Sequence, residues 1–137
     1  MKVIFGTTNK RKVEDLQNII SKLNLDMEVL SLSDIGWDRG EIEETGETVE
    51  INSFIKAEAI FNFTSEKHIN YPIITDDAGL FCEALKGEPG VFTARYADDE
   101  LALDPSLPKH QCVIKLLRNL NGSNNRKAYY KCAVTCM

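Results

Sequence analysis

The alternation of apolar and polar positions divides the N-terminal part of the chain into short elements. Residues 2–5 form an apolar run that predicts a strand, and residues 6–9 (Gly-Thr-Thr-Asn) predict a loop with residues that favour a helix cap. Apolar residues then recur at helical spacing, at Val13, Leu16, Ile19, Ile20 and Leu23. The chain therefore opens with a strand, a loop and a helix, and residues 28–32 predict a second strand.

A second helix is predicted after an acidic stretch. Residues 38–50 carry six acidic side chains diluted by one arginine, a composition typical of a solvated loop. Thr48 is placed to cap a helix that reaches about residue 63, with Glu50 in its first turn, and this helix carries Lys56. Its inner side is predicted to hold Phe54, Ala57, Ile60 and Phe61.

The next apolar run, residues 71–75, predicts a strand that enters the core and delivers two adjacent aspartates at its C-terminal end. Successive side chains of a strand point to opposite faces, so Asp76 and Asp77 can serve one function only if the strand has ended there. Gly79, just beyond them, indicates that it has.

The C-terminal part of the chain predicts a turn, a helix and a strand. The turn holds Gly87, Pro89 and Gly90, and the strand covers residues 128–136, where the two faces alternate regularly. The helix is marked by Val113, Leu116, Leu117 and Leu120 and stops at Gly122. Strands that alternate with helices predict a single α/β domain over residues 1–137.

Composition and charge narrow the class of protein. A chain of 137 residues with 43% apolar and 27% charged residues is typical of one globular domain. The net charge of −5 disfavours binding of polymeric nucleic acid, which needs a basic face, but it is compatible with a small anion held by a few cations. The N-terminus predicts neither a signal peptide nor a membrane span, so we expect a cytoplasmic protein.

The four cysteines, at positions 82, 112, 132 and 136, show no C-x-x-C spacing and no histidine partners at zinc-ligand spacing. Buried, reduced thiols are the expected state, because free cysteine is among the most buried residue types. Disulfide or metal use is the alternative.

Cations crowd the predicted start of the first helix, where the helix dipole usually favours acidic residues. They are Lys10, Arg11 and Lys12. A bound anion can supply the missing negative charge, because free backbone N–H groups and a lysine form a phosphate site. The P-loop pattern is absent. The alternative is that the three side chains extend into water, and the loop sequence alone does not separate the two interpretations.

The paired aspartates suggest chemistry only in combination with other residues. One carboxylate can ligate Mg²⁺, which proteins bind through one or two carboxylates and phosphate oxygens, while the other orients or deprotonates water. Adjacent aspartates also occur in plain surface turns. Asp76 and Asp77, the acidic stretch, Lys56 and the cationic loop together form the set that phosphoryl chemistry needs.

Three segments resemble the inosine triphosphate pyrophosphatase family, whose members hydrolyse non-canonical purine nucleoside triphosphates. In order, they are GTTNKRK, EETGETVEINSFIKAEA and TDDAGLFCEALKGEPGVFTARYA. The resemblance spans essentially the whole chain and implies a mixed central sheet flanked by helices, in a protein that is usually a dimer. It also implies a Mg²⁺-dependent attack of water on the α-phosphorus of ITP, dITP or XTP, with release of pyrophosphate.

The resemblance also assigns roles to individual residues. It implies that Asp77 is the general base or water-orienting group. The metal carboxylates fall on Glu44, Asp76 and Asp77. The substrate contacts fall on Thr7, Thr8, Asn9, Lys10, Lys12, Lys56, Ala78, Gly79 and Arg95. The family usually carries glycine at position 8, glutamate at position 51 and a hydroxyl residue at position 78, and none of these departures removes a metal ligand.

The larger departure is at the C-terminus. Family members continue past the last predicted strand with a glycine-rich aromatic loop and a Ser-His-Arg motif that hold the purine base, and this sequence contains neither. The resemblance therefore implies a chain that lacks the C-terminal part of the family fold. An unpaired sheet edge favours association, so we expect a homodimer. Two alternatives stay open: a truncated relative that only binds nucleotide and metal, and an interaction module whose acidic loop docks a basic partner.

Overall fold

The computed structural model describes all residues from 1 to 137 and contains a mixed sheet of five strands. Strand β1 is parallel to β2 and β3, whereas β4 is antiparallel to β3, and β5 also pairs with β3. This arrangement confirms the predicted α/β class. The elements are β1 (Lys2–Phe5), α1 (Lys10–Lys22), β2 (Glu28–Leu30), α2 (Val49–Glu66), β3 (Ile73–Cys82), β4 (Pro89–Gly90), α3 (Asp98–Leu103), α4 (Gln111–Asn119) and β5 (Ala128–Cys136), with 3₁₀ turns at Glu83–Leu85 and Thr93–Arg95.

The chain groups into two compact units. The first unit consists of Met1–Asp77 and Ala133–Met137, and the second of Ala78–Cys132. Strands β3 and β5 each contribute residues to both units, so the single α/β domain stays a prediction. None of the helices combines the length and the apolar character that a membrane span requires.

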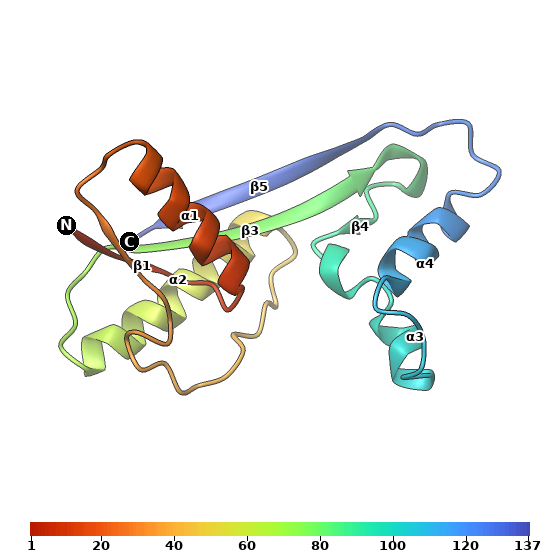
Figure 1. Cartoon of the computed structure of the whole chain (residues 1–137). Coiled ribbons are helices and arrows are strands. Elements are labelled where there is room, and N and C mark those ends of the chain that lie inside the picture. The colour runs from red at the N-terminus through yellow and green to blue at the C-terminus, as the bar shows by residue number, and fades with distance from the viewer. The chain divides into compact units, whose positions relative to one another are not determined.

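In the first unit, alternate residues of a strand face different helices. Val3 of β1 belongs to a core cluster with residues of α1, whereas Ile4 packs in a second cluster with residues of α2. Strand β3 repeats this alternation, with Ile73 in the α2 cluster and Ile74 against the α1 cluster. Helices α1 and α2 therefore cover opposite faces of the sheet, as Figure 1 shows.

Strand β3 is longer than the sequence predicts. It continues through both aspartates to Cys82, so the expectation that it ends at Asp76 is wrong. Gly79 lies inside this strand. Glycine is needed at this position because a Cβ atom there would come 2.4 Å from the carbonyl oxygen of Gly90, where β4 runs beside β3. Glycine inside a strand marks such a close approach of two backbones as well as a strand end.

The buried side of α2 also differs from the prediction. Thr48 caps the helix as expected, with its hydroxyl accepting a hydrogen bond from the Ile51 N–H at 3.2 Å. Of the four residues predicted to point inward, Ala57 and Ile60 are fully buried, whereas Phe54 and Phe61 are about half exposed. The residues that are fully buried near the start of α2 include two polar ones, Asn52 and Ser53.

The four cysteines form no disulfides, and their burial is uneven. Cys82 is buried as predicted, and Cys112 is partly buried. Cys132 and Cys136 are exposed, because most of β5 is open to solvent. The expected burial therefore holds for Cys82 only.

Candidate functional site

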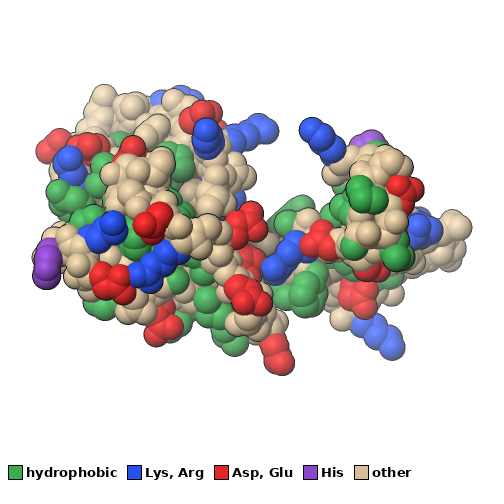
Figure 2. Space-filling view, turned by 90° about the horizontal axis from the view of Figure 1, so that it is seen from below, with side chains coloured by type: hydrophobic (Ala, Val, Ile, Leu, Met, Phe, Trp, Pro, Cys, Tyr) green, Lys and Arg blue, Asp and Glu red, His purple; other side chains and the backbone are tan.

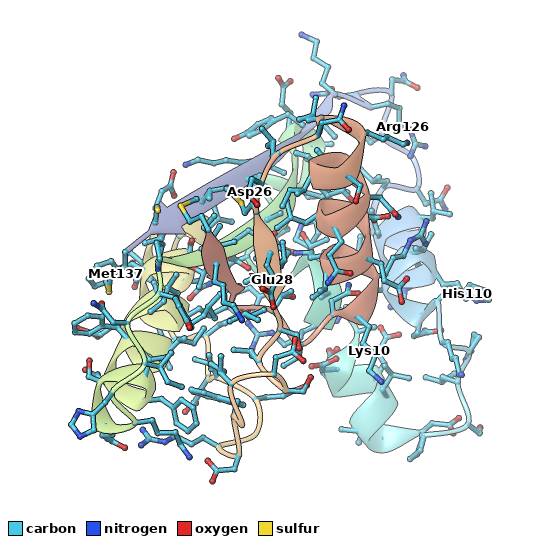
Figure 3. All side chains as sticks on the ribbon, turned by 60° about the vertical axis from the view of Figure 1, so that its left-hand side comes forward. Lys10, Asp26, Glu28, His110, Arg126 and Met137 are labelled. Atoms are coloured by element: carbon cyan, nitrogen blue, oxygen red, sulfur yellow. The ribbon has the colours of Figure 1, made fainter.

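The loop after β1 ends in a capped helix start with an excess of positive charge. Asn9 caps α1 by accepting a hydrogen bond from the Arg11 N–H at 3.0 Å, and the Thr7 hydroxyl accepts one from the Asn9 N–H at 3.2 Å. The first turn of α1 contains no acidic residue. Figure 3 labels Lys10 at this end of the helix. The helix dipole and the lysines together favour an anion at this position.

Gly6 brings this loop close to β3. Its N–H donates to the carbonyl of Ile74 at 2.7 Å. A Cβ atom at position 6 would lie 2.3 Å from Ile60 Cδ1 and 2.6 Å from Thr75 Cγ2, so a larger residue would push the loop away. The cationic loop is therefore held beside the part of β3 that leads to the two aspartates.

On the α1 face of β3, Lys12 is paired with Asp76. The ammonium of Lys12 donates to Asp76 Oδ2 at 2.6 Å. The other oxygen, Oδ1, is buried and accepts no hydrogen bond from the protein. One of the two predicted phosphate lysines thus contacts one of the predicted metal carboxylates.

On the α2 face, Lys56 bridges two carboxylates. Its ammonium donates to Glu44 Oε1 at 2.9 Å and to Asp77 Oδ1 at 3.2 Å. The side chains of Lys56 and Asp77 are only 13% and 12% exposed. A charged pair this far from water is costly unless its geometry is good, and the single lysine offsets both carboxylates at once. Asp77 Oδ2 is buried without a hydrogen-bond partner.

The two neighbouring aspartates therefore face in opposite directions. Because β3 continues through them, Asp76 faces α1 and Asp77 faces α2, and each meets its own lysine. Glu44 shares its lysine with Asp77 rather than with Asp76. The structure thus forms two lysine–carboxylate groups where the sequence predicts one shared cluster.

The carboxylates of Glu44, Asp76 and Asp77 are the candidate ligands for a divalent cation. No three histidine, cysteine, aspartate or glutamate side chains form a ready metal-binding group. However, Asp76 Oδ1 and Asp77 Oδ2 are buried acceptors without donors, and such oxygens need a proton, a donor or a cation. Carboxylate oxygens are also the ligands that Mg²⁺ prefers, one or two of them being enough when phosphates or water complete the shell. The free oxygens of Asp76 and Asp77 thus have the chemistry of cation ligands, but the structure does not gather Glu44, Asp76 and Asp77 into one ligand set.

Comparison with known proteins shows the family of this chain. The model of the Ham1 family matches residues 3–137. The chain belongs to the Ham1 family. This result confirms the resemblance seen in the three sequence segments, because relatives in the family are named dITP/XTP pyrophosphatases.

Several relatives of known sequence or structure can be compared directly. The dITP/XTP pyrophosphatase of Christiangramia forsetii is 37% identical over 134 residues, which are 98% of this chain and 63% of that protein. The Ham1 protein of Staphylococcus aureus matches the whole chain with a TM-score of 0.76 and 31% identity, over 63% of its own length. A HAM1 protein from Coxiella burnetii gives a TM-score of 0.78 at 25% identity, again over 63% of its length. This Ham1 chain thus spans about 63% of the length of these relatives.

Three predicted substrate residues of this Ham1 protein lie in its second unit. Ala78 is exposed on β3, and Gly79 packs against Gly90. Arg95 closes the turn Thr93–Arg95, with its guanidinium 6.0 Å from the centre of the Phe92 ring. It lines a cavity of about 370 Å³ together with Glu88, Pro89, Phe92, Tyr96, Asp99 and Lys115. Within this cavity, burial raises the pKa of Tyr96.

Sequence reasoning missed three buried polar residues on α2 and β3. Asn52, Ser53 and Thr75 are all fully buried and hydrogen-bonded near the lysine–carboxylate group. Short polar residues on a helix usually face water, so neither Asn52 nor Ser53 stood out. Their spacing of four and three residues from Lys56 is the one signal in the sequence that could have identified them.

Proposed function

We propose that this Ham1 family protein hydrolyses the non-canonical purine nucleoside triphosphates ITP, dITP and XTP to the monophosphate and pyrophosphate, with Mg²⁺ as its cofactor. The bridge that Lys56 makes between Glu44 and Asp77 carries the proposal. Together with the Lys12–Asp76 pair, it sets cations beside carboxylates in the way that a metal-bound polyphosphate requires. The names of the dITP/XTP pyrophosphatase relatives support the substrate class.

The proposed phosphate-binding groups lie at the start of α1. Backbone N–H groups at the helix start and the Lys12 ammonium hold the phosphates. Lys56 supplies a second cation from α2. The further contacts predicted for the substrate are those of Thr7, Thr8, Asn9, Lys10, Ala78, Gly79 and Arg95.

The opposite directions of the two aspartates favour separate roles for them. Following the resemblance, we assign Asp76 and Glu44 to the metal and Asp77 to the attacking water, although in the structure Glu44 shares Lys56 with Asp77 and does not share Lys12 with Asp76. Bound Mg²⁺ supplies positive charge that stabilises the phosphate oxygens during the reaction. Asp77 Oδ2 has no hydrogen-bond donor in the protein. It accepts a proton from the water while the water oxygen forms a bond to the α-phosphorus. The bond from the α-phosphorus to the bridging oxygen breaks, and pyrophosphate leaves.

A second candidate is a relative that binds nucleotide and metal without turnover. The two lysine–carboxylate groups favour it as well, because they can hold phosphates and a cation whether or not a water is activated. Incubation with ITP and Mg²⁺, followed by separate assays of pyrophosphate and orthophosphate, distinguishes the two. Pyrophosphate release supports hydrolysis. Protection from heat by ITP without any release supports binding alone.

We also propose that the protein acts in the cytoplasm as a homodimer. Tyr129, Tyr130 and Val134 of β5 are each more than half exposed, and Tyr130 reaches 71%. Apolar and aromatic side chains gathered on an open strand favour association. Figure 2 shows acidic and basic side chains interspersed on one face of the first unit. Sedimentation at low concentration tests the proposal, and a monomer under all conditions contradicts it.

A further inference from the structure

Asn52, on the first turns of α2, ties the acidic loop to the helix. Its Oδ1 accepts a hydrogen bond from the Gly46 N–H at 2.7 Å, and the side chain is fully buried. A Cβ atom at position 46 would lie 2.7 Å from that same oxygen, so glycine allows the close contact. The amide nitrogen Nδ2 is buried without a hydrogen-bond partner in the protein, so the contact to Gly46 is made by the acceptor side of Asn52.

Ser53, the next residue, ties the helix to β3. The Thr75 hydroxyl donates to the carbonyl of Ser53 at 2.7 Å, and the Ser53 hydroxyl lies 3.3 Å from both the carbonyl and the hydroxyl of Thr75. Ser53 also donates to the Thr135 hydroxyl of β5 at 2.9 Å. Ser53 and Thr75 are fully buried, so these hydrogen bonds are shielded from water.

These contacts repeat the pairing pattern of Lys56 one helical turn earlier. Lys56 lies four residues after Asn52 and three after Ser53, which places all three on one side of α2. Glu44 lies two residues before Gly46 in the acidic loop, and Asp77 lies two after Thr75 on the same face of β3. Neutral hydrogen bonds thus join the same two segments to α2 that Lys56 joins through charges.

We infer that Asn52, Ser53 and Thr75 are positioning residues that hold Lys56 within reach of Glu44 and Asp77 at once. The ammonium of a lysine sits at the end of a flexible four-carbon chain. The lysine alone therefore does not fix the distance between the two carboxylates. The neutral hydrogen bonds fix the loop and the strand, and the ammonium then meets both oxygens. If Lys56 is displaced by about 1 Å, turnover should fall by up to ~100-fold. This consequence for turnover rests on the proposed function.

The test observes Lys56 directly by NMR of the lysine side-chain ammonium groups in ¹⁵N-labelled protein without substrate. The wild type is expected to give a slowly exchanging Lys56 signal, because two carboxylates hold a side chain that is 13% exposed. Thr75→Val and Ser53→Ala should broaden or shift that signal, and Thr75→Ser, which keeps the hydroxyl, should restore it. Asn52→Ala should alter it through the acidic loop.

Thr64→Val is the matched control. Thr64 is also buried on α2, but its hydroxyl donates to the Phe61 carbonyl of the same helix at 3.0 Å and reaches neither the acidic loop nor β3. This variant should lose stability while the Lys56 signal stays unchanged. If Ser53 and Thr75 only stabilise the fold, Thr75→Val should also lose stability while the Lys56 signal stays unchanged. That result overturns the inference.

Turnover of ITP gives a second measurement. We expect Thr75→Val and Ser53→Ala to lower kcat by ~10- to 100-fold with little change in KM, and Thr75→Ser to retain most of the activity. If the wild type does not hydrolyse ITP but its ammonium signal responds as described, the proposed function fails while the inference holds. A wild-type protein without a protected Lys56 signal, or Ser53→Ala and Thr75→Val signals equal to wild type, overturns the inference. Ser53→Ala decides the test if Thr75→Val does not fold.

Discussion

Lys12 donates a hydrogen bond to Asp76 across 2.6 Å, from α1 to β3. A lysine assigned to phosphate thus neutralises a carboxylate assigned to metal, and Lys56 does the same for Glu44 and Asp77. A cation bound at the free oxygens of Asp76 and Asp77 weakens the attraction of these carboxylates for their lysines, and phosphate binding draws the same lysines away. Binding of the metal should therefore raise the affinity for phosphate, and binding of phosphate should raise the affinity for the metal.

This exchange predicts coupled binding of the divalent cation and the triphosphate tail. Tripolyphosphate should raise the affinity for Mn²⁺, used as a probe for Mg²⁺, by about 5- to 150-fold, the usual range of coupling between sites. Titration calorimetry with Mn²⁺, with and without tripolyphosphate, measures the effect. Lys12→Ala should mainly weaken tripolyphosphate binding and reduce the coupling.

Lys2→Gln is the control for the coupling experiment. Lys2 pairs with Glu28 at 3.3 Å through exposed side chains at the starts of β1 and β2, so its loss also removes a lysine–carboxylate pair. Its Mn²⁺ binding should follow the wild type. Equal Mn²⁺ affinity of the wild type in the presence and absence of tripolyphosphate would rule out the exchange.

Asp77→Asn should abolish turnover while nucleotide binding persists. The amide oxygen of asparagine can still accept from Lys56, but it cannot take a proton from water, so a loss of roughly 100- to 10,000-fold in kcat is expected. Single-turnover assays with ITP measure the rate, and calorimetry measures binding. Unaltered turnover would show that Asp77 is not the base.

The fold was predictable from sequence where its causes are local. The apolar run of β1, the helical spacing of α1 and the Thr48 cap each depend on neighbouring residues, and all three appear in the structure as expected. The length of β3 was misjudged because the reason for Gly79 lies in Gly90, which is distant along the chain.

The site residues, too, were predictable where they lie in recognisable segments and were missed where their partners are distant in sequence. The candidate residues Glu44, Lys56 and Asp77 came from recognisable segments, and the structure brings these three together. The buried hydroxyl of Ser53 was missed because its partner, Thr75, lies 22 residues away. Alternation along a strand did predict opposite directions for neighbouring aspartates, and only the assumed strand end concealed that result.

The close approach of β3 and β4 predicts a large effect for Gly79→Ala. The added Cβ would lie 2.4 Å from the Gly90 oxygen and 2.8 Å from its carbonyl carbon, both backbone atoms that cannot move without shifting β4. A loss of about 1–3 kcal/mol in the free energy of unfolding is expected, as for other overpacked sites. Urea denaturation measures it.

Gly122→Ala provides the comparison for Gly79→Ala. Position 122 has open space around it but a φ of +80°, so alanine there costs only the conformational strain of about 1 kcal/mol. If Gly79→Ala is no more destabilising than Gly122→Ala, the backbones of β3 and β4 are not in close contact at Gly79.

The second unit contains a carboxylate whose ionisation stabilises the folded state. Glu100 of α3 accepts hydrogen bonds from Gln111 at 2.6 Å and from Arg118, both on α4. These bonds, first that of Gln111 and then that of Arg118, lower the pKa of Glu100 below its ordinary value. A lowered pKa in the folded state means that the contribution is complete above the pKa of the unfolded chain, about 4.3, and is lost as the pH falls through the folded value.

Glu100→Gln should therefore flatten the acid dependence of stability. The variant should have a lower Tm than the wild type at neutral pH. The difference should begin to shrink below about pH 4, where Glu100 of the unfolded chain takes up a proton, and should vanish once the folded-state carboxyl is protonated too. Thermal unfolding followed from pH 7 downward measures both curves. Glu14→Gln, which removes one exposed charge from α1, controls for the change in net charge. A constant Tm difference between wild type and Glu100→Gln at every pH would show that ionisation of Glu100 does not stabilise the contact between α3 and α4.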